Sequence, residues 1–163
     1  MKTLLLLRHG KSSWTDTSLA DYDRPLKKRG REAAKRMGRL IRELNLVPDH
    51  ILTSSAARAV TTAELAATEA EFDGEVEVVP VLYHADPSAF VAIVSRIPNL
   101  FERVLIVGHN PGLEDWLDRL IGHVETFPTA ALAQIELPVD SWLELSTDTR
   151  GKLQGLWRPK EIA

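Results

Sequence analysis

The chain has 163 residues, of which 44% are hydrophobic and 26% are charged, a balance typical of one compact globular domain spanning residues 1–163. Its formal net charge of −3 provides no general attraction to nucleic acid, so any affinity for phosphate must come from a few basic residues placed locally. The chain has no cysteine, which excludes disulfides and thiolate metal sites.

The apolar run at the N-terminus is short. It extends from Leu4 to Leu7 and is interrupted by Arg8, so it resembles a buried strand more than the core of a signal peptide. Nowhere does the chain approach the ~20 apolar residues that a membrane span requires. We therefore expect a soluble, cytoplasmic protein that does not associate with membranes.

Short aliphatic segments alternate with longer segments of helical periodicity along the first three quarters of the chain. This alternation predicts crossover units and a largely parallel sheet. Strands are expected at 3–7, 50–53, 76–79 and 103–107, each buried, and helices at 27–44, 56–70, 87–97 and 112–121.

The last third of the chain differs, because its apolar segments are short and separated by Pro138, Asp148 and Gly151. Segments 131–137, 142–145 and 152–157 are predicted to be strands that pair at one edge of the sheet, at least one of them antiparallel. The predicted fold class is therefore α/β, with a mainly parallel sheet and an antiparallel edge strand.

Three of the predicted strands end in residues suited to binding phosphate. The first continues into Arg8, His9 and Gly10, the second is followed by Arg58 at a helix start, and the fourth is followed by His109. In an open α/β sheet, ligands bind beyond the carboxyl ends of the strands. Two histidines and two arginines are therefore predicted to meet at one edge.

Each of these residue types has a chemical reason to lie at a phosphate site. Arg8 and Arg58 are expected to neutralise a phosphoryl dianion and to hold its oxygens in pairs. His9 is predicted to be the nucleophile, since a neutral imidazole has a free lone pair. His109 would donate to a phosphoryl oxygen, and Gly10 would leave room for the phosphoryl group.

Simpler interpretations exist for each residue taken alone. A histidine after a strand is often structural, an arginine near a helix start is often a surface charge, and Asn110-Pro111-Gly112 is typical of a turn. The joint placement at strand ends favours the phosphate site. The arginine charges would repel a cation, so neither a metal nor another cofactor is expected.

The ordered motifs resemble those of the histidine phosphatase superfamily, also called phosphoglycerate mutase-like, and within it the short SixA-type phosphohistidine phosphatases. The similarity covers nearly the whole chain. The matching segments are 7–12 with the Arg-His-Gly signature, 21–30, 53–63 around Arg58, 107–112 around His109 and 128–133. The resemblance implies a three-layer α/β/α sandwich, no metal, a phosphorylated His9, and a phosphate pocket formed by Arg8, Arg58 and His109.

One departure from the superfamily concerns the general acid. Larger members place a glutamate after the third strand, whereas this chain has no glutamate in 81–86. Asp86 is the nearest carboxylate and is either a general acid or the cap of the helix that starts at Pro87, and His84 is an alternative acid. Phosphohistidine needs no dedicated carboxylic acid, because its leaving nitrogen protonates near neutral pH.

The leading hypothesis is a phosphatase that acts on phosphohistidine in a phosphorylated partner protein. Arg24 is either part of a basic rim that attracts phosphate or the partner of a neighbouring aspartate. A small-molecule phosphomonoesterase and a catalytically silent phosphate-binding module are the alternatives, and a nucleophile at position 9 argues against the latter. The sequence indicates no oligomeric state.

Overall fold

The computed structural model describes residues 1–162, which form one mixed sheet of six strands in the order β3-β2-β4-β1-β5-β6. The strands are β1 (Lys2–Arg8), β2 (His50–Thr53), β3 (Val76–Val78), β4 (Arg103–Gly108), β5 (Leu132–Leu137) and β6 (Lys152–Trp157). The α-helices are α1 (Lys28–Glu43), α2 (Ala57–Glu69), α3 (Pro87–Val94) and α4 (Gly112–Ile121). Within this described part, no helix combines the length and the apolar character needed to cross a membrane.

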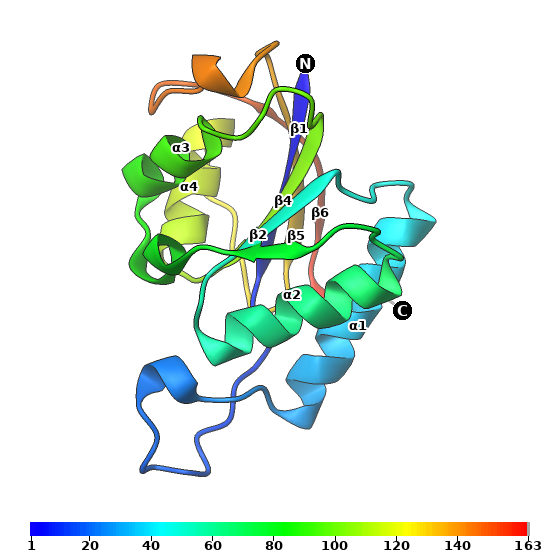
Figure 1. Ribbon diagram of the computed structural model, residues 1–163, viewed down its shortest axis with the longest axis vertical. Coiled ribbons are helices and arrows are strands. Elements are labelled where there is room, and N and C mark those ends of the chain that lie inside the picture. Colours follow the sequence, from blue (N-terminus) through cyan, green and yellow to red (C-terminus); the bar gives the residue numbers. More distant parts are fainter. Residues whose placement is uncertain (163) are drawn as a thin grey trace.

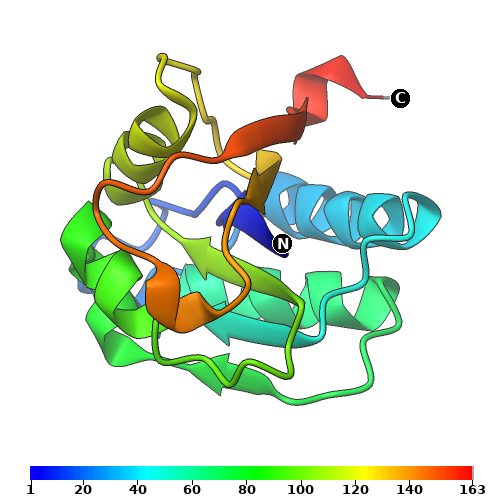
Figure 2. The same ribbon diagram turned by 90° about the horizontal axis from the view of Figure 1, so that it is seen from above.

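The helices cover both faces of the sheet, as Figure 1 and the view from above in Figure 2 show. The four leucines of β1 alternate between these faces. Leu4 and Leu6 pack in the core beneath α3 and α4, whereas Leu5 and Leu7 pack beneath α1 and α2. The central strand is therefore apolar at consecutive positions because it is buried on both sides. The fold is the predicted three-layer α/β/α sandwich.

The direction of the strands changes between β1 and β5. β3, β2, β4 and β1 are parallel neighbours, whereas β5 runs antiparallel to β1 and β6 runs antiparallel to β5. The sheet is mixed, and its antiparallel pairs lie on the side formed by the C-terminal third of the chain, which confirms the expected antiparallel pairing of segments 131–137 and 152–157. The parallel part brings the carboxyl ends of β1, β2 and β4 to one edge.

Two predicted strands differ in the structure. Segment 142–145 is not a strand: Trp142–Glu144 forms a 3-10 turn capped by Ser141, with the Trp142 indole buried and donating to the Phe101 carbonyl at 2.7 Å. Strand β3 is present but not buried, because it is the edge strand beside β2 and its Val78 is 47% exposed. In both segments, therefore, an apolar composition does not indicate a strand in the centre of the sheet.

Candidate active site

The register of two parallel strands brings His9 and His109 together. β1 and β4 pair so that Arg8 lies opposite Gly108, and each histidine directly follows its strand. The His9 amide donates to the Gly108 carbonyl at 3.1 Å, which extends the pairing by one residue. The two imidazole rings lie 5.0 Å apart between centroids. The predicted meeting of these histidines therefore follows from one strand pair.

The His9 ring has a defined orientation. Its Nδ1 lies 2.7 Å from the Gly10 carbonyl oxygen, which only accepts, so Nδ1 carries the proton and Nε2 carries the lone pair. Burial is the main cause that lowers the pKa of His9 to about 4, and the positive charges of Arg58, Arg8 and Arg24 lower it further. His9 is thus a neutral imidazole at neutral pH, with a nucleophilic Nε2.

Gly10 packs closely against helix α1. A Cβ atom at this position would lie 2.6 Å from the carbonyl oxygen of Gly30, in the first turn of α1. A Cβ on Gly30 would in turn meet the Lys11 carbonyl oxygen at 2.2 Å. The two glycines therefore allow the backbone after β1 to contact helix α1 directly, which is a packing reason for glycine at position 10 that the sequence pattern does not reveal.

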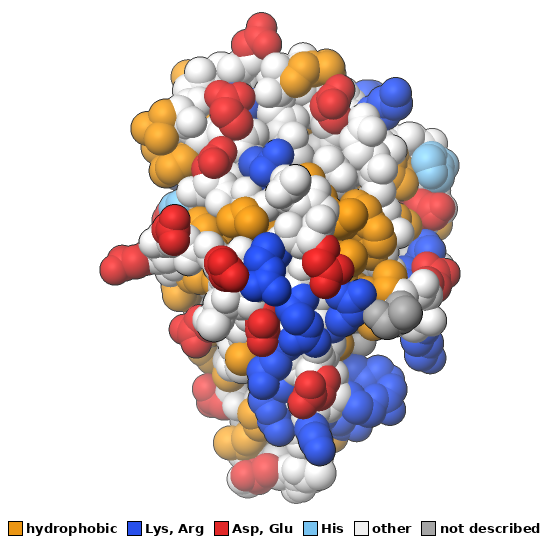
Figure 3. All heavy atoms as spheres, turned by 90° about the vertical axis from the view of Figure 1, so that its right-hand side faces the viewer, with side chains coloured by type: hydrophobic (Ala, Val, Ile, Leu, Met, Phe, Trp, Pro, Cys, Tyr) orange, Lys and Arg blue, Asp and Glu red, His pale blue; other side chains and the backbone are white. Residues whose placement is uncertain are grey.

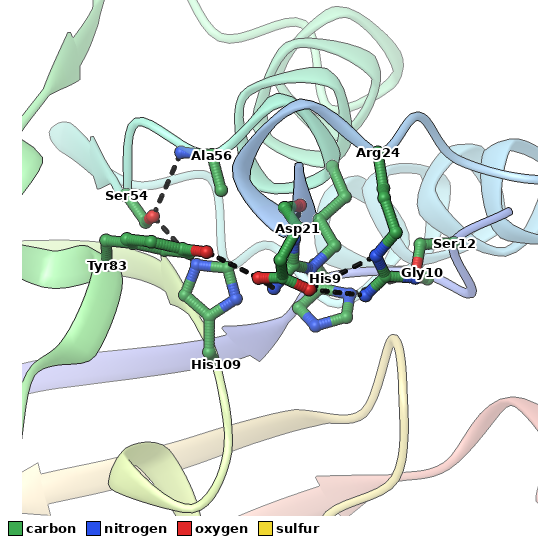
Figure 4. Close-up of polar contacts among 10 residues, drawn as sticks. His9, Gly10, Ser12, Asp21, Arg24, Ser54, Ala56, Tyr83 and His109 are labelled. Atoms are coloured by element: carbon green, nitrogen blue, oxygen red, sulfur yellow. Dashed lines mark hydrogen bonds and ion pairs between the residues drawn. The ribbon is translucent and has the colours of Figure 1, made fainter. Parts of the chain in front are cut away.

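Asp21 connects the arginines of the site. One of its carboxylate oxygens accepts from Arg24 Nε and Nη2 at 3.1 and 2.9 Å, and the other accepts from Arg58 Nη2 at 3.0 Å. Arg58 Nη1 also donates to the Asp21 carbonyl at 2.7 Å. Figure 4 shows the carboxylate between Arg24 and Tyr83, whose hydroxyl donates to it. The Tyr83 hydrogen bond and the arginine contacts hold the pKa of Asp21 far below its usual range.

Arg24 pairs with a neighbouring aspartate, as one of its two interpretations expects, and it also lines the cavity. Besides pairing with Asp21, its Nη1 donates to the Ser12 hydroxyl at 2.7 Å, and its guanidinium stacks over the Trp14 ring with Cζ 3.4 Å from the ring centroid. The side chain is buried, and it lines the same cavity as His9. The sequence pattern does not predict the link from Asp21 to Arg58, and nothing in it connects Tyr83 with the site.

His109 leaves one ring nitrogen available. Its Nε2 lies 2.7 Å from the Ser54 hydroxyl, which also accepts from the Ala56 amide at 3.2 Å, whereas Nδ1 is buried and has no partner among the described residues. Burial, with smaller contributions from His9 and Arg58, lowers the pKa of His109 to about 3. When the Ser54 hydroxyl donates to Nε2, Nδ1 carries the proton and is an available donor.

These side chains surround an open cavity of about 400 Å³. Its lining includes five basic residues and both histidines but no carboxylate, and Arg58 Nε faces no partner within residues 1–162. Arg8, at the end of β1, donates from Nη1 to the Phe127 carbonyl at 3.3 Å, and burial lowers its pKa.

Among residues 1–162, no three histidine, cysteine, aspartate or glutamate side chains gather as a metal site requires. The arrangement suits an anion with several oxygens. The basic lining residues are Arg8, Lys11, Arg24, Lys27 and Arg58.

The comparison with protein families agrees with this geometry. Residues 4–86, which contain Arg8, His9 and Arg58, match the family described as histidine phosphatase superfamily (branch 1). The chain belongs to this superfamily. Membership supports a phosphatase activity for the site at the end of β1.

Several known proteins resemble the chain over most of its length. An uncharacterized chloroplastic protein of Arabidopsis thaliana is 32% identical over 176 residues, covering 97% of this chain and 78% of that protein. The crystal structure of a putative phosphohistidine phosphatase SixA from Agrobacterium tumefaciens has a TM-score of 0.82 at 26% identity, covering 97% of this chain and 98% of that one. The protein histidine phosphatase SixA solved with tungstate has a TM-score of 0.83 at 21% identity, with 98% of each chain covered, and it shares the fold.

Asp86, the carboxylate that segment 81–86 offers as a general acid, is a helix cap. Asp86 precedes α3, and its Oδ1 accepts from the Ala89 amide at 2.9 Å and from the Ser88 hydroxyl at 2.7 Å. These hydrogen bonds lower the pKa of Asp86. Asp86 and His84 line a small neighbouring hollow that also reaches His109, and neither lines the cavity around His9.

Proposed function

We propose that the protein is a phosphatase that transfers a phosphoryl group from phosphohistidine in a partner protein to Nε2 of His9 and then to water. The observation that carries this proposal is the free Nε2 of a neutral His9 beside an open cavity lined by arginines. A binding module would need the arginines but not a buried, oriented and unprotonated imidazole. The site therefore fits turnover better than binding alone.

In the first step, the Nε2 lone pair of His9 forms a bond to phosphorus while the bond to the leaving nitrogen breaks. The leaving imidazole takes its proton from solvent. Arg8 and Arg58 hold the phosphoryl oxygens, and His109 Nδ1–H donates to one of them as charge spreads over the equatorial positions. A phosphoryl dianion at this place also replaces the missing partners of the buried Arg58 Nε and His109 Nδ1.

In the second step, water attacks the phosphorus of phosphorylated His9. The bond to Nε2 breaks, its electron pair returns to the imidazole, and hydrogenphosphate leaves with one proton released to solvent. This proton balances the one taken up in the first step, so the net reaction is hydrolysis. The Gly10 carbonyl keeps Nδ1 protonated throughout, which returns Nε2 to the same state for each cycle.

The choice of phosphohistidine rests on the leaving group. An alkoxide needs a general acid, which contributes about a hundredfold or more in rate. No carboxylate lines the described cavity, Asp21 is held ionised by its arginines, and Asp86 is held as a cap. An imidazole leaving group protonates near neutral pH and needs no such acid. A small-molecule phosphoester is therefore the less favoured substrate of this site.

The test is to measure turnover of a phosphohistidine-bearing protein beside aryl and sugar phosphates, and to trap the intermediate by rapid acid-free quenching. We expect turnover to favour phosphohistidine and an acid-labile phosphate to appear on the enzyme. The label should be absent from His9→Ala and present on His123→Ala, which changes an exposed histidine outside the cavity. A labelled His9→Ala protein would exclude His9 as the nucleophile.

A further inference from the structure

A second hollow lies next to the phosphate cavity. It has a volume of about 620 Å³ and shares Lys11 and Thr129 with the cavity around His9. One wall is the start of helix α1, the other is the C-terminal segment 158–161, and Pro128 lies between them. Lys11 and Thr129 therefore lie where the groove and the phosphate cavity meet.

Five of the eleven residues that line the groove are basic, and the aliphatic parts of the lining make up much of its surface. Figure 3 shows lysine and arginine side chains gathered over the face that carries α1 and the C-terminal end. Two acidic residues, Glu32 and Glu161, lie among five basic ones, and Glu161 already pairs with Arg158 at 3.2 Å. This excess of positive charge stands out on a chain of net charge −3. The basic lining residues are Lys11, Lys28, Arg29, Arg158 and Lys160.

The lysines and the arginine nearest the cavity repel one another. Arg29 is the largest cause that lowers the pKa of Lys11, and Lys160 and Lys27 lower it further. None of these four side chains has a carboxylate partner among the ion pairs of the described residues. Like charges gathered without counter-charges destabilise a surface unless an anion binds there.

The start of helix α1 is a second feature that favours the binding of an anion. Its cap residue is Lys27, no side chain caps the helix, and its first turn holds Lys28 and Arg29 with no acidic residue. A helix N-terminus favours negative charge, so cations at this position weaken the helix. These basic residues therefore lower the stability of α1. The N-terminal end of the helix itself also attracts an anion.

We infer that this groove, defined by Lys11, Lys28, Arg29, Arg158 and Lys160, binds an acidic segment of the protein that presents the phosphorylated side chain. This inference rests on the proposed function, because it assigns the partner's charge for that same site. The aliphatic parts of the lining, with Ala33, Pro128 and Pro159, would pack against the segment while the cations pair with its carboxylates.

Two synthetic peptides test the inference. Both carry the same phosphohistidine, one flanked by glutamates and the other by glutamines. We expect the wild-type protein to turn over the glutamate peptide with a kcat/KM about tenfold higher, and the ratio to approach one in 0.5 M NaCl, since salt screens exposed charges. A ratio near one at low salt would overturn the inference while leaving the phosphatase proposal intact.

The matched variants separate the groove from the chemistry. The double variant Arg29→Glu/Lys160→Glu should lose the preference for the glutamate peptide and keep its turnover of phosphoramidate, a small substrate with the same kind of bond. Arg96→Glu should keep both, because Arg96 is exposed beyond the end of α3 that faces away from the site. If the single variant Arg96→Glu lost the preference for the glutamate peptide, the net charge of the protein and not the groove would be the cause of that preference.

A binding measurement keeps the inference independent of turnover. The fluorescent glutamate peptide should bind His9→Ala more tightly than the glutamine peptide, as followed by anisotropy, even if no substrate is hydrolysed by the wild type. An oligonucleotide of equal charge should compete less well than the glutamate peptide. Stronger competition by the oligonucleotide would overturn the inference in favour of a nucleic acid.

Discussion

The carboxylate of Asp21 accepts a hydrogen bond from Arg58 at 3.0 Å, although 37 residues separate them in the sequence. The short 3-10 turn Asp21–Asp23 and the first turn of α2 are thereby joined beside the cavity that Arg58 lines. The same carboxylate binds Arg24. One acidic side chain outside the cavity lining thus fixes two of the cations that line the cavity.

Replacing Asp21 tests its part in positioning Arg58. Asp21→Ala should lower kcat by roughly tenfold, because two guanidinium groups lose a charged acceptor that holds their planes. Asp21→Asn should retain part of the activity, since an amide oxygen still accepts from one arginine. Because the Asp21 side chain is 47% exposed, the midpoint of thermal unfolding should change little. A loss of rate that only follows a loss of folded protein would contradict the positioning role.

The effect of Gly30→Ala on the free energy of unfolding distinguishes close packing from helix propensity, because the two predict changes of opposite sign. In an exposed helix, alanine in place of glycine adds about 1 kcal/mol of stability. At Gly30 the new Cβ would meet the Lys11 carbonyl oxygen at 2.2 Å, so Gly30→Ala should instead lower the free energy of unfolding by about 1–3 kcal/mol. Denaturant unfolding measures this change. A more stable variant would show that the contact between α1 and the loop after His9 is loose.

Much of the fold and of the cavity lining was predictable because it depends on features that are local in sequence. β1 is apolar at consecutive positions, which indicates a strand buried on both faces, and the residue after such a strand lies at the sheet edge. That logic places His9, His109 and Arg58 correctly. It does not prove their chemical roles, which remain proposals.

The features that sequence patterns miss depend on contacts between distant segments. Tyr83 reaches Asp21 only because the segment after β3 folds back over the start of α2, and no periodicity encodes that return. Segment 142–145 has strand-like composition, but Leu143 is 80% exposed and Ser141 caps a turn there. The packing of Gly10 against Gly30 was missed for the same reason, since the two glycines are distant in sequence.

The role of Asp86 is tested by two substitutions. Asp86→Asn should leave turnover of phosphohistidine nearly unchanged, because asparagine caps a helix about as well as aspartate. Asp86→Ala should lower the midpoint of denaturant unfolding, because the helix loses the cap that accepts from the Ala89 amide. A rate loss of about a hundredfold in Asp86→Asn, with an intact fold, would instead identify Asp86 as the proton donor.

The buried histidines make the stability of the protein depend on pH. His9 and His109 have pKa values lowered to about 4 and about 3, whereas each has a value near 6.5 when unfolded. Below about pH 6.5 the unfolded chain therefore binds protons that the folded chain does not, so the free energy of unfolding falls as pH decreases toward 4. Each histidine contributes a slope of at most about 1.4 kcal/mol per pH unit in this window and nothing above it.

Denaturant unfolding of the phosphate-free protein between pH 7.5 and 4.5 measures this slope, and comparison with His9→Gln removes the contribution of carboxylates that titrate in both proteins. The variant should lose roughly half of the histidine-dependent slope, because His109 still titrates. Saturating inorganic phosphate should reduce the slope of the wild type as well, since a bound dianion favours the protonated imidazoles and raises their pKa values. Equal slopes for the wild type and His9→Gln would mean that His9 is protonated in the folded protein near pH 6, and a protonated His9 has no lone pair with which to attack phosphorus.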